Sequence, residues 1–85
     1  MNISRDEQRV LHALAQGGCI AYARGENGRV FRVDCFNRDG FRLADCTLEV
    51  FAKLRRKRLI ESRSSCPYRI SEKGRRFVRS QPDNR

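Results

Sequence analysis

The sequence contains no tryptophan, one methionine, two prolines and a single histidine among its 85 residues. No stretch reaches the roughly 18 apolar residues of a membrane-spanning helix, and the amino terminus lacks the apolar core of a signal peptide. We therefore expect a cytoplasmic protein without a membrane partner. A chain of this length forms one domain and buries only about 60–65% of its unfolded surface, which excludes large enzymes and multidomain receptors.

Acidic residues are also scarce, since ten Asp and Glu stand against nineteen Lys and Arg, a formal net charge of +9. The excess is uneven: residues 1–46 carry a net charge of +1, whereas residues 47–85 carry +8. Phosphate backbones and acidic protein surfaces are the natural partners of such a chain. The concentration of charge in one half favours a docking surface over a general contribution to solubility.

Residues with catalytic or metal-binding chemistry are few. The four cysteines, Cys19, Cys35, Cys46 and Cys66, include no closely spaced pair of the kind that binds zinc, so free thiols and no metal site are expected. His12 falls on the polar side of a predicted helix, with no nucleophile at a fixed helical spacing. Without a glycine-rich phosphate loop, the sequence predicts a protein that is not an enzyme and uses no cofactor or small-molecule substrate.

The first half predicts a helix followed by a β-hairpin. Ser4 and Glu7 form a capping box, and apolar residues at helical spacing extend the helix from about Arg5 to Gln16, where Gly17-Gly18 ends it. A hairpin follows from roughly Cys19 to Phe36, turning at Asn27-Gly28, a dipeptide suited to a type I′ turn. In its second strand Phe31, Val33 and Cys35 alternate with polar residues, which places the three on one face.

The middle of the chain is ambiguous, and the helical period then returns. Asn37 to Gly40 is a turn signal, while residues 41–46 are too short and mixed to assign. A second helix begins at Thr47, with Thr47 or Asp45 as its cap and Val50, Phe51 and Leu54 on its apolar side. The last elements expected are short strands at Leu59-Ile60 and Tyr68-Arg69-Ile70 and a helix that starts at Ser71, runs from Glu72 to about Arg79 and is stopped by Pro82.

This order indicates an α+β fold with three main helices and two β-hairpins. The second half, from Thr47 to Arg75, resembles the recognition helix, wing and closing helix of winged-helix regulators. The first half departs from that pattern, because a hairpin stands where such proteins place their second helix; if residues 41–44 form that helix, it is a single turn. We expect one winged-helix-like domain over residues 1–79 and a polar tail over residues 80–85.

The candidate binding residues are the basic ones of the second half. On the second helix Lys53, Arg56 and Lys57 share or border the face opposite the apolar stripe, and the alternative is a solvated face in which Glu49 pairs with Lys53. No Asn or Gln on that face could read adenine, which favours contact with the phosphate backbone. The complete set for binding nucleic acid or a partner is Lys53, Arg56, Lys57, Arg63, Arg69, Arg75, Arg76 and Arg79.

Several short motifs together resemble the YjhX family of small bacterial proteins. They are Asn2-Ile3-Ser4-Arg5, Glu7-Gln8-Arg9, Leu11-His12, Gly17-Gly18, Leu43-Ala44-Asp45-Cys46-Thr47-Leu48, Val50-Phe51, Lys53-Leu54, Pro67-Tyr68-Arg69-Ile70, Val78-Arg79 and Gln81-Pro82-Asp83-Asn84-Arg85. The resemblance implies a toxin of a toxin–antitoxin pair whose partner is a GNAT-type acetyltransferase. It supplies no catalytic residue, and it makes the tail residues Gln81, Asp83, Asn84 and Arg85 candidate partner contacts.

Two functions follow from these observations. The first is a cytoplasmic toxin that acts without catalysis, by binding nucleic acid or a protein that handles it. The second is a winged-helix DNA-binding transcriptional regulator that uses the same basic residues. A small nuclease is disfavoured because the sequence offers no metal cluster and no base–nucleophile pair.

Overall fold

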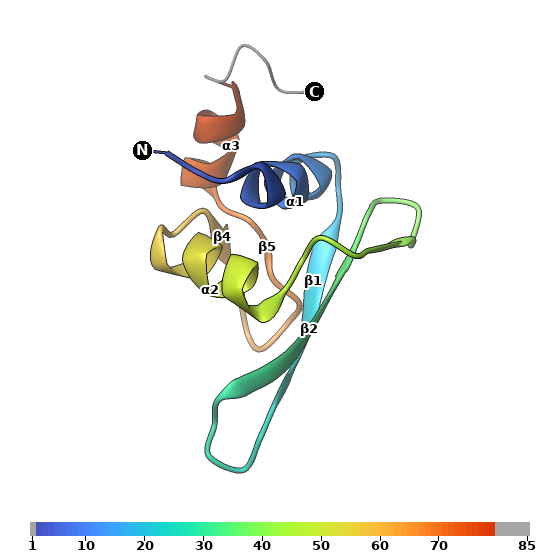
Figure 1. Cartoon of the computed structure of the whole chain (residues 1–85), viewed down its shortest axis with the longest axis vertical. Coiled ribbons are helices and arrows are strands. Elements are labelled where there is room, and N and C mark those ends of the chain that lie inside the picture. The colour runs from blue at the N-terminus through green and yellow to red at the C-terminus, as the bar shows by residue number, and fades with distance from the viewer. Residues whose placement is uncertain (1, 80–85) are drawn as a thin grey trace.

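The helices and strands of the computed structural model, which describes residues 2–79, follow the α+β order that the sequence predicts (Figure 1). A three-stranded antiparallel sheet, β1-β2-β3, and a two-stranded antiparallel sheet, β4-β5, are combined with three helices. The elements are α1 (Arg5–Ala15), β1 (Cys19–Arg24), β2 (Val30–Phe36), β3 (Arg42–Leu43), α2 (Leu48–Arg56), β4 (Ile60–Glu61), β5 (Arg69–Ile70) and α3 (Glu72–Arg79).

The capping box predicted for α1 is present. The backbone N–H of Glu7 donates to Ser4 Oγ at 3.2 Å, and the backbone N–H of Ser4 donates to Glu7 Oε1 at 3.1 Å. After the helix ends, Gly17 adopts a φ of +112°, as expected of a glycine that reverses the chain. The next residue, Gly18, lies against the carbonyl oxygen of Phe36, where a Cβ atom would clash, so the chain can enter β1 only through a glycine.

The predicted hairpin is confirmed, but its turn is not type I′. That turn needs two consecutive residues with positive φ, and within residues 25–29 only Gly28 has one, at +79°. The loop is instead closed by the N–H of Gly25, which donates to the Arg29 carbonyl at 2.8 Å. The side chain of Asn27 accepts the Arg29 N–H at 3.0 Å, and this local bond stabilises the longer loop.

A bulge in β2 overturns the expected facing of Phe31. The register passes from Ala23 opposite Arg32 directly to Arg24 opposite Val30, which leaves Phe31 without a cross-strand partner. Val30 consequently packs against the core, whereas the Phe31 side chain is 59% exposed. Val33 and Cys35 are buried as predicted.

The ambiguous middle segment forms a strand, so the single-turn helix considered for residues 41–44 is wrong. The Asn37–Gly40 turn is confirmed: Asn37 Oδ1 accepts the N–H groups of Asp39 and Phe41, both at 2.9 Å. Because this turn reverses the chain, β3 returns alongside β2, with Leu43 opposite Cys35. Phe41 lies at the turn and is 71% exposed.

The second half follows the predicted order of helix, two short strands and helix. Thr47 caps α2 by accepting the N–H of Val50 at 3.2 Å. Ser71 Oγ accepts the N–H of Gly74 at 3.0 Å in the first turn of α3. Gly74 lies directly against the Leu59 carbonyl, which explains a glycine inside a helix. The stop expected at Pro82 and the tail over residues 80–85 lie outside the described residues.

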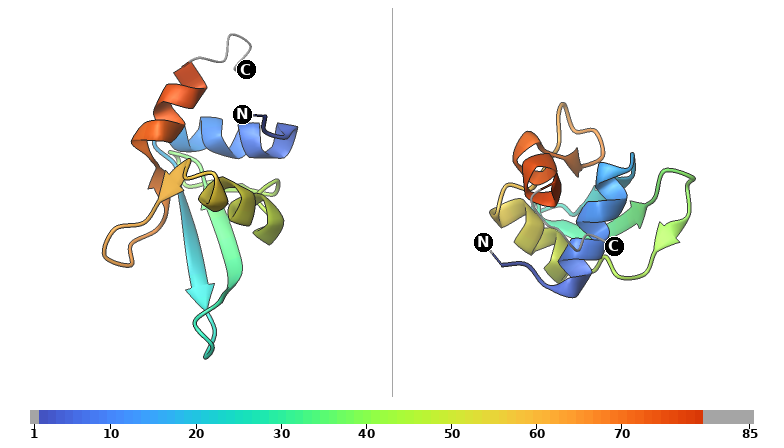
Figure 2. Two further views of the ribbon diagram at one scale, coloured as in Figure 1. Left: turned by 90° about the vertical axis from the view of Figure 1, so that its left-hand side faces the viewer. Right: turned by 90° about the horizontal axis from the view of Figure 1, so that it is seen from above.

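The core lies between the helices and the part of the β1–β2 hairpin that contains Ile20, Val33 and Cys35. Val10, Leu11 and Leu14 of α1 meet Val50, Phe51 and Leu54 of α2 in one cluster with both sheets. Ile20 and Tyr68 join the sheets, because the N–H of each donates to the carbonyl of the other at 2.8 Å. The β1–β2 hairpin extends away from the helices (Figure 2). None of the described helices is long and apolar enough to cross a membrane.

Candidate nucleic-acid interface

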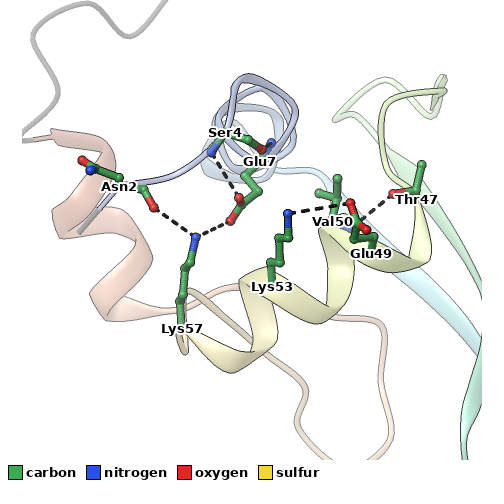
Figure 3. Close-up of polar contacts among 8 residues, drawn as sticks. All are labelled: Asn2, Ser4, Glu7, Thr47, Glu49, Val50, Lys53 and Lys57. Atoms are coloured by element: carbon green, nitrogen blue, oxygen red, sulfur yellow. Dashed lines mark hydrogen bonds and ion pairs between the residues drawn. The ribbon is translucent and has the colours of Figure 1, made fainter.

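The basic residues of α2 differ in how free they are to meet a ligand (Figure 3). Lys53 lies 3.7 Å from Glu49, whose side chain is 80% exposed, in the loose helical pair that the sequence suggests. The Arg56 side chain is exposed and makes no hydrogen bond or ion pair with any residue from 2 to 79. Both can contact a ligand at little cost, since exposed pairs contribute only about 0–1 kcal/mol.

Lys57 is engaged within the fold. Its Nζ donates to Glu7 Oε2 at 2.8 Å and to the carbonyl oxygen of Asn2 at 3.1 Å. The Glu7 side chain is only 2% exposed and that of Lys57 is 27% exposed, so this pair is largely withdrawn from water. A phosphate could recruit Lys57 only by leaving the Glu7 carboxylate buried without its main partner, which is costly.

The electrostatics of Glu7 reflect this arrangement. Burial by itself raises the pKa of a carboxyl group, but here the hydrogen bond from Lys57 and those from Ser4 outweigh it and hold the pKa of Glu7 below its usual value. The carboxylate therefore fixes α1 to α2 while serving as part of the cap of α1. Lys57, at the end of α2, is the other partner of this ion pair. Sequence spacing could not reveal the pair because its two residues belong to separate parts of the chain.

Three predicted arginines meet in one groove beside the β4–β5 strands. Arg63, Arg69 and Arg75 line a depression of about 360 Å³ together with Glu61, Cys66, Pro67 and Ile70. The strand register places Arg69 opposite Glu61, and α3 begins two residues after β5, which brings Arg75 to the same place. Among residues 2–79 the one carboxylate in the lining, that of Glu61, lies 3.3 Å from Arg63 Nη2. Positive charge from Arg63, Arg69 and Arg75 therefore dominates this groove, which we call the wing groove after the wing that the sequence analysis suggests for this segment.

The remaining predicted residues extend the basic surface along α3. The side chains of Arg76, Arg79 and Lys73 are exposed, and none of the three makes a hydrogen bond or ion pair within residues 2–79. Arg79 follows Arg75 by one helical turn, which places both on the same side of α3. The candidates Gln81, Asp83, Asn84 and Arg85 lie outside the described residues.

A second arginine-lined groove was not predicted. Arg24 and Arg29 of the hairpin and Arg55 of α2 line a depression of about 370 Å³. Arg55 is distant in sequence from the other two, which belong to the nearly neutral first half. No periodicity or motif links them, so only the folded chain could reveal the site.

Groups with catalytic potential are dispersed. His12 Nε2 lies 3.2 Å from Gln16 Nε2, and its Nδ1 is buried without a partner among residues 2–79. The cysteines are free thiols: Cys35 and Cys46 are buried and Cys66 is exposed. A hydrogen bond with Cys46, and then burial, raises the pKa of Cys35. No cluster of His, Cys, Asp and Glu in the described part of the chain could hold a metal ion.

The fold and the grooves define a small, basic α+β protein with surfaces suited to anionic ligands. Comparison with known proteins gives the family: the chain belongs to the YjhX toxin family, described as "Putative toxin of bacterial toxin-antitoxin pair", whose model matches residues 1–85. The family expected from the sequence motifs is thereby confirmed.

Relatives in several bacteria match the whole chain. A UPF0386 protein of Beijerinckia indica is 72% identical over 85 residues, and one of Ruegeria sp. strain TM1040 is 68% identical; both alignments cover all of each chain. A UPF0386 protein of Brucella anthropi is 62% identical, again with full coverage of both chains. No solved structure is significantly similar to this chain.

Proposed function

We propose that this chain is the toxin of a toxin–antitoxin pair and that it acts in the cytoplasm by binding nucleic acid, without catalysing a reaction. Family membership supports the toxin part of the proposal. The observation that supports the binding mechanism is the wing groove, where three arginines surround one carboxylate that already has a partner. Guanidinium groups suit phosphate oxygens because they offer two parallel donors.

The proposed interface also includes exposed or loosely paired basic side chains of α2 and α3. Arg56 and Lys53 on α2 and Arg76 and Arg79 on α3 would add phosphate contacts to those of Arg63, Arg69 and Arg75. Contacts of this kind position the backbone and do not read bases, so binding with little sequence preference is expected. Lys57 is left out of this set because it holds Glu7.

The proposed antitoxin partner is a GNAT-type acetyltransferase, as the family resemblance implies, and the toxin could equally act on a protein that handles nucleic acid. The winged-helix regulator remains the second candidate, favoured by the succession of α2, β4, β5 and α3. A regulator would prefer one duplex sequence over a shuffled duplex of equal length. It would also leave growth normal when expressed alone.

The test combines induced expression in a bacterial host with DNA binding at several salt concentrations. Arg69→Glu/Arg75→Glu should restore growth and weaken binding, and it should reduce the slope of log K against log salt by about 2, from roughly −4 to −5 for about five phosphate contacts. Arg5→Glu/Arg38→Glu makes the same change in net charge on exposed residues outside the groove and should behave as the unaltered chain.

Two results would count against the proposal, each on a different part. Normal growth when the unaltered chain is expressed without an antitoxin would remove the toxin function. Growth arrest combined with DNA affinity that does not respond to salt would retain the toxin and remove the nucleic-acid mechanism, leaving a protein as its target.

A further inference from the structure

The second groove lies between the distal half of the β1–β2 hairpin and α2. Three arginines line it, Arg24 and Arg29 from the hairpin and Arg55 from the helix. The apolar part of the lining, called the floor below, is formed by Val30, Leu48, Phe51 and Ala52. No carboxylate from residues 2–79 belongs to the lining, which contrasts with the wing groove.

Two of the three guanidinium groups are held in place by aromatic rings. Arg24 lies 5.2 Å from the centre of the Tyr22 ring and donates through Nη1 to the Gly28 carbonyl at 2.8 Å. Arg55 lies 5.6 Å from the centre of the Phe51 ring. Each contact limits the rotamer freedom that the arginine would otherwise lose on binding a ligand.

The rings that hold these arginines form one continuous row. Tyr68 contacts Tyr22 edge to face at 5.2 Å and Phe51 edge to face at 4.9 Å. The row crosses from the hairpin to α2 and carries a guanidinium at each end. The spacing of Arg24 and Arg55 is therefore set by packed aromatic side chains, which gives the groove a preorganised pair of anion sites.

The floor distinguishes among anionic ligands. Its exposed apolar residue is Leu48, at 43% exposure, whereas Phe51 is buried and its ring is already occupied by Arg55. Single-stranded nucleic acid binds to exposed aromatic faces on which bases stack, and this floor offers an aliphatic side chain in their place. An apolar side chain of a peptide fits such a floor, with carboxylates on either side reaching the arginines.

We infer that this groove binds an acidic, amphipathic segment of a partner protein, with an apolar side chain on Leu48 and carboxylates at Arg24, Arg29 and Arg55. The inference rests on the proposed function in that a toxin needs a partner, and it names the chemistry of that partner's contact. It places the partner in a groove that shares no lining residue with the wing groove.

The test selects random short peptides displayed on phage against the full chain. Peptides enriched in Asp and Glu around Leu, Ile, Val or Phe are expected. Arg29→Glu should weaken their binding about tenfold or more, the effect of losing one charge-assisted contact and adding repulsion. The Arg29 side chain has no hydrogen bond or ion pair within residues 2–79, so this change leaves the fold intact.

A second variant probes the floor. Leu48→Asp replaces an exposed side chain in the first turn of α2, where an acidic residue is compatible with the helix, and should also abolish selection of acidic peptides. Arg38→Glu, an exposed arginine in another turn, should retain it. Enriched peptides without acidic residues, or binding that Arg29→Glu leaves unchanged, would overturn the inference. A single-stranded oligonucleotide that displaces the peptides and itself depends on Arg29 would overturn it in favour of nucleic acid. These outcomes do not depend on toxicity or on the wing groove.

Discussion

Lys57→Met should destabilise the protein far more than its place in a basic helix suggests. The substitution keeps most of the aliphatic stem and removes the ammonium group that donates to Glu7 at 2.8 Å and to the Asn2 carbonyl at 3.1 Å. Glu7 remains buried between the helices, hydrogen-bonded to Ser4 but without a countercharge. The expected cost is that of an uncompensated carboxylate.

The size of the effect follows from the burial of the two side chains. Removing one partner of a fully buried ion pair costs about 3–5 kcal/mol. Lys57 is 27% exposed and the Ser4 hydrogen bond stays, so the free energy of unfolding should fall by about 2 kcal/mol. In a domain of this size that loss lowers Tm by roughly 8–16 °C, which thermal unfolding followed by circular dichroism can measure.

The difference in the free energy of unfolding between the unaltered protein and the Lys57→Met variant should depend on pH. Because the pKa of Glu7 is lowered in the folded protein, its stabilising contribution is complete above its unfolded pKa of about 4.3 and is lost as pH falls through the lowered folded value. Without the hydrogen bond and charge of Lys57, the pKa of Glu7 should lie above its value in the unaltered protein, so the variant should take up its proton at higher pH. The two stabilities should therefore converge in acid.

Lys53→Met is the matched control, since it removes the same charge from the same helix. Its partner Glu49 is exposed, and the expected loss is below about 0.5 kcal/mol. Equal losses for Lys57→Met and Lys53→Met at neutral pH would refute the structural role of Lys57. A difference in unfolding free energy between the two variants that stays the same in acid would refute the conclusion that the loss comes from Glu7.

Two further predictions concern packing and thiol access. Gly74→Ala should lower the free energy of unfolding, measured in urea, by about 2–3 kcal/mol. The reason is that the new Cβ meets the Leu59 carbonyl and comes within 2.7 Å of Ile70 Cγ1. A gain of about 1 kcal/mol, as helix propensity alone would give, would contradict this packing. An aromatic disulfide reagent near pH 8 should react rapidly with Cys66 and slowly with Cys35 and Cys46, and Cys66→Ser should remove the rapid phase. Fast modification of Cys35 in the folded chain would show that its site opens readily.

Features governed by neighbouring residues could be predicted from the sequence. Ser4, Glu7 and Thr47 act through backbone groups within three residues, so residue type and spacing were sufficient to locate the starts of α1 and α2. The Asn37–Gly40 turn was recognisable for the same reason, because its bonds are made by its own side chain and backbone.

Features decided by distant parts of the chain could not be predicted. Phe31 alternates correctly with Val33 and Cys35, yet a bulge in the pairing with β1 exposes it. Residues 42 and 43 become a strand because β2 offers a free edge, which their own sequence does not reveal. The candidate sites also depend on distant parts of the chain. The sequence indicates Arg63, Arg69 and Arg75 as basic residues, but it does not show that they share a groove. The groove at Arg24, Arg29 and Arg55 likewise depends on the packing of separate elements.

The link between Ile20 and Tyr68 bears on how the chain folds. The β1–β2 hairpin and the helices contain mainly local contacts, which form quickly. The β4–β5 pair joins only two residues on each strand and is too small to persist alone, so it must wait for Tyr68 to reach Ile20 across a long loop. Formation of the β4–β5 pair should therefore be the late step, and it should fail when the first half of the chain is removed. We consequently do not expect the basic second half to fold as an autonomous module that recombination could transfer to another protein.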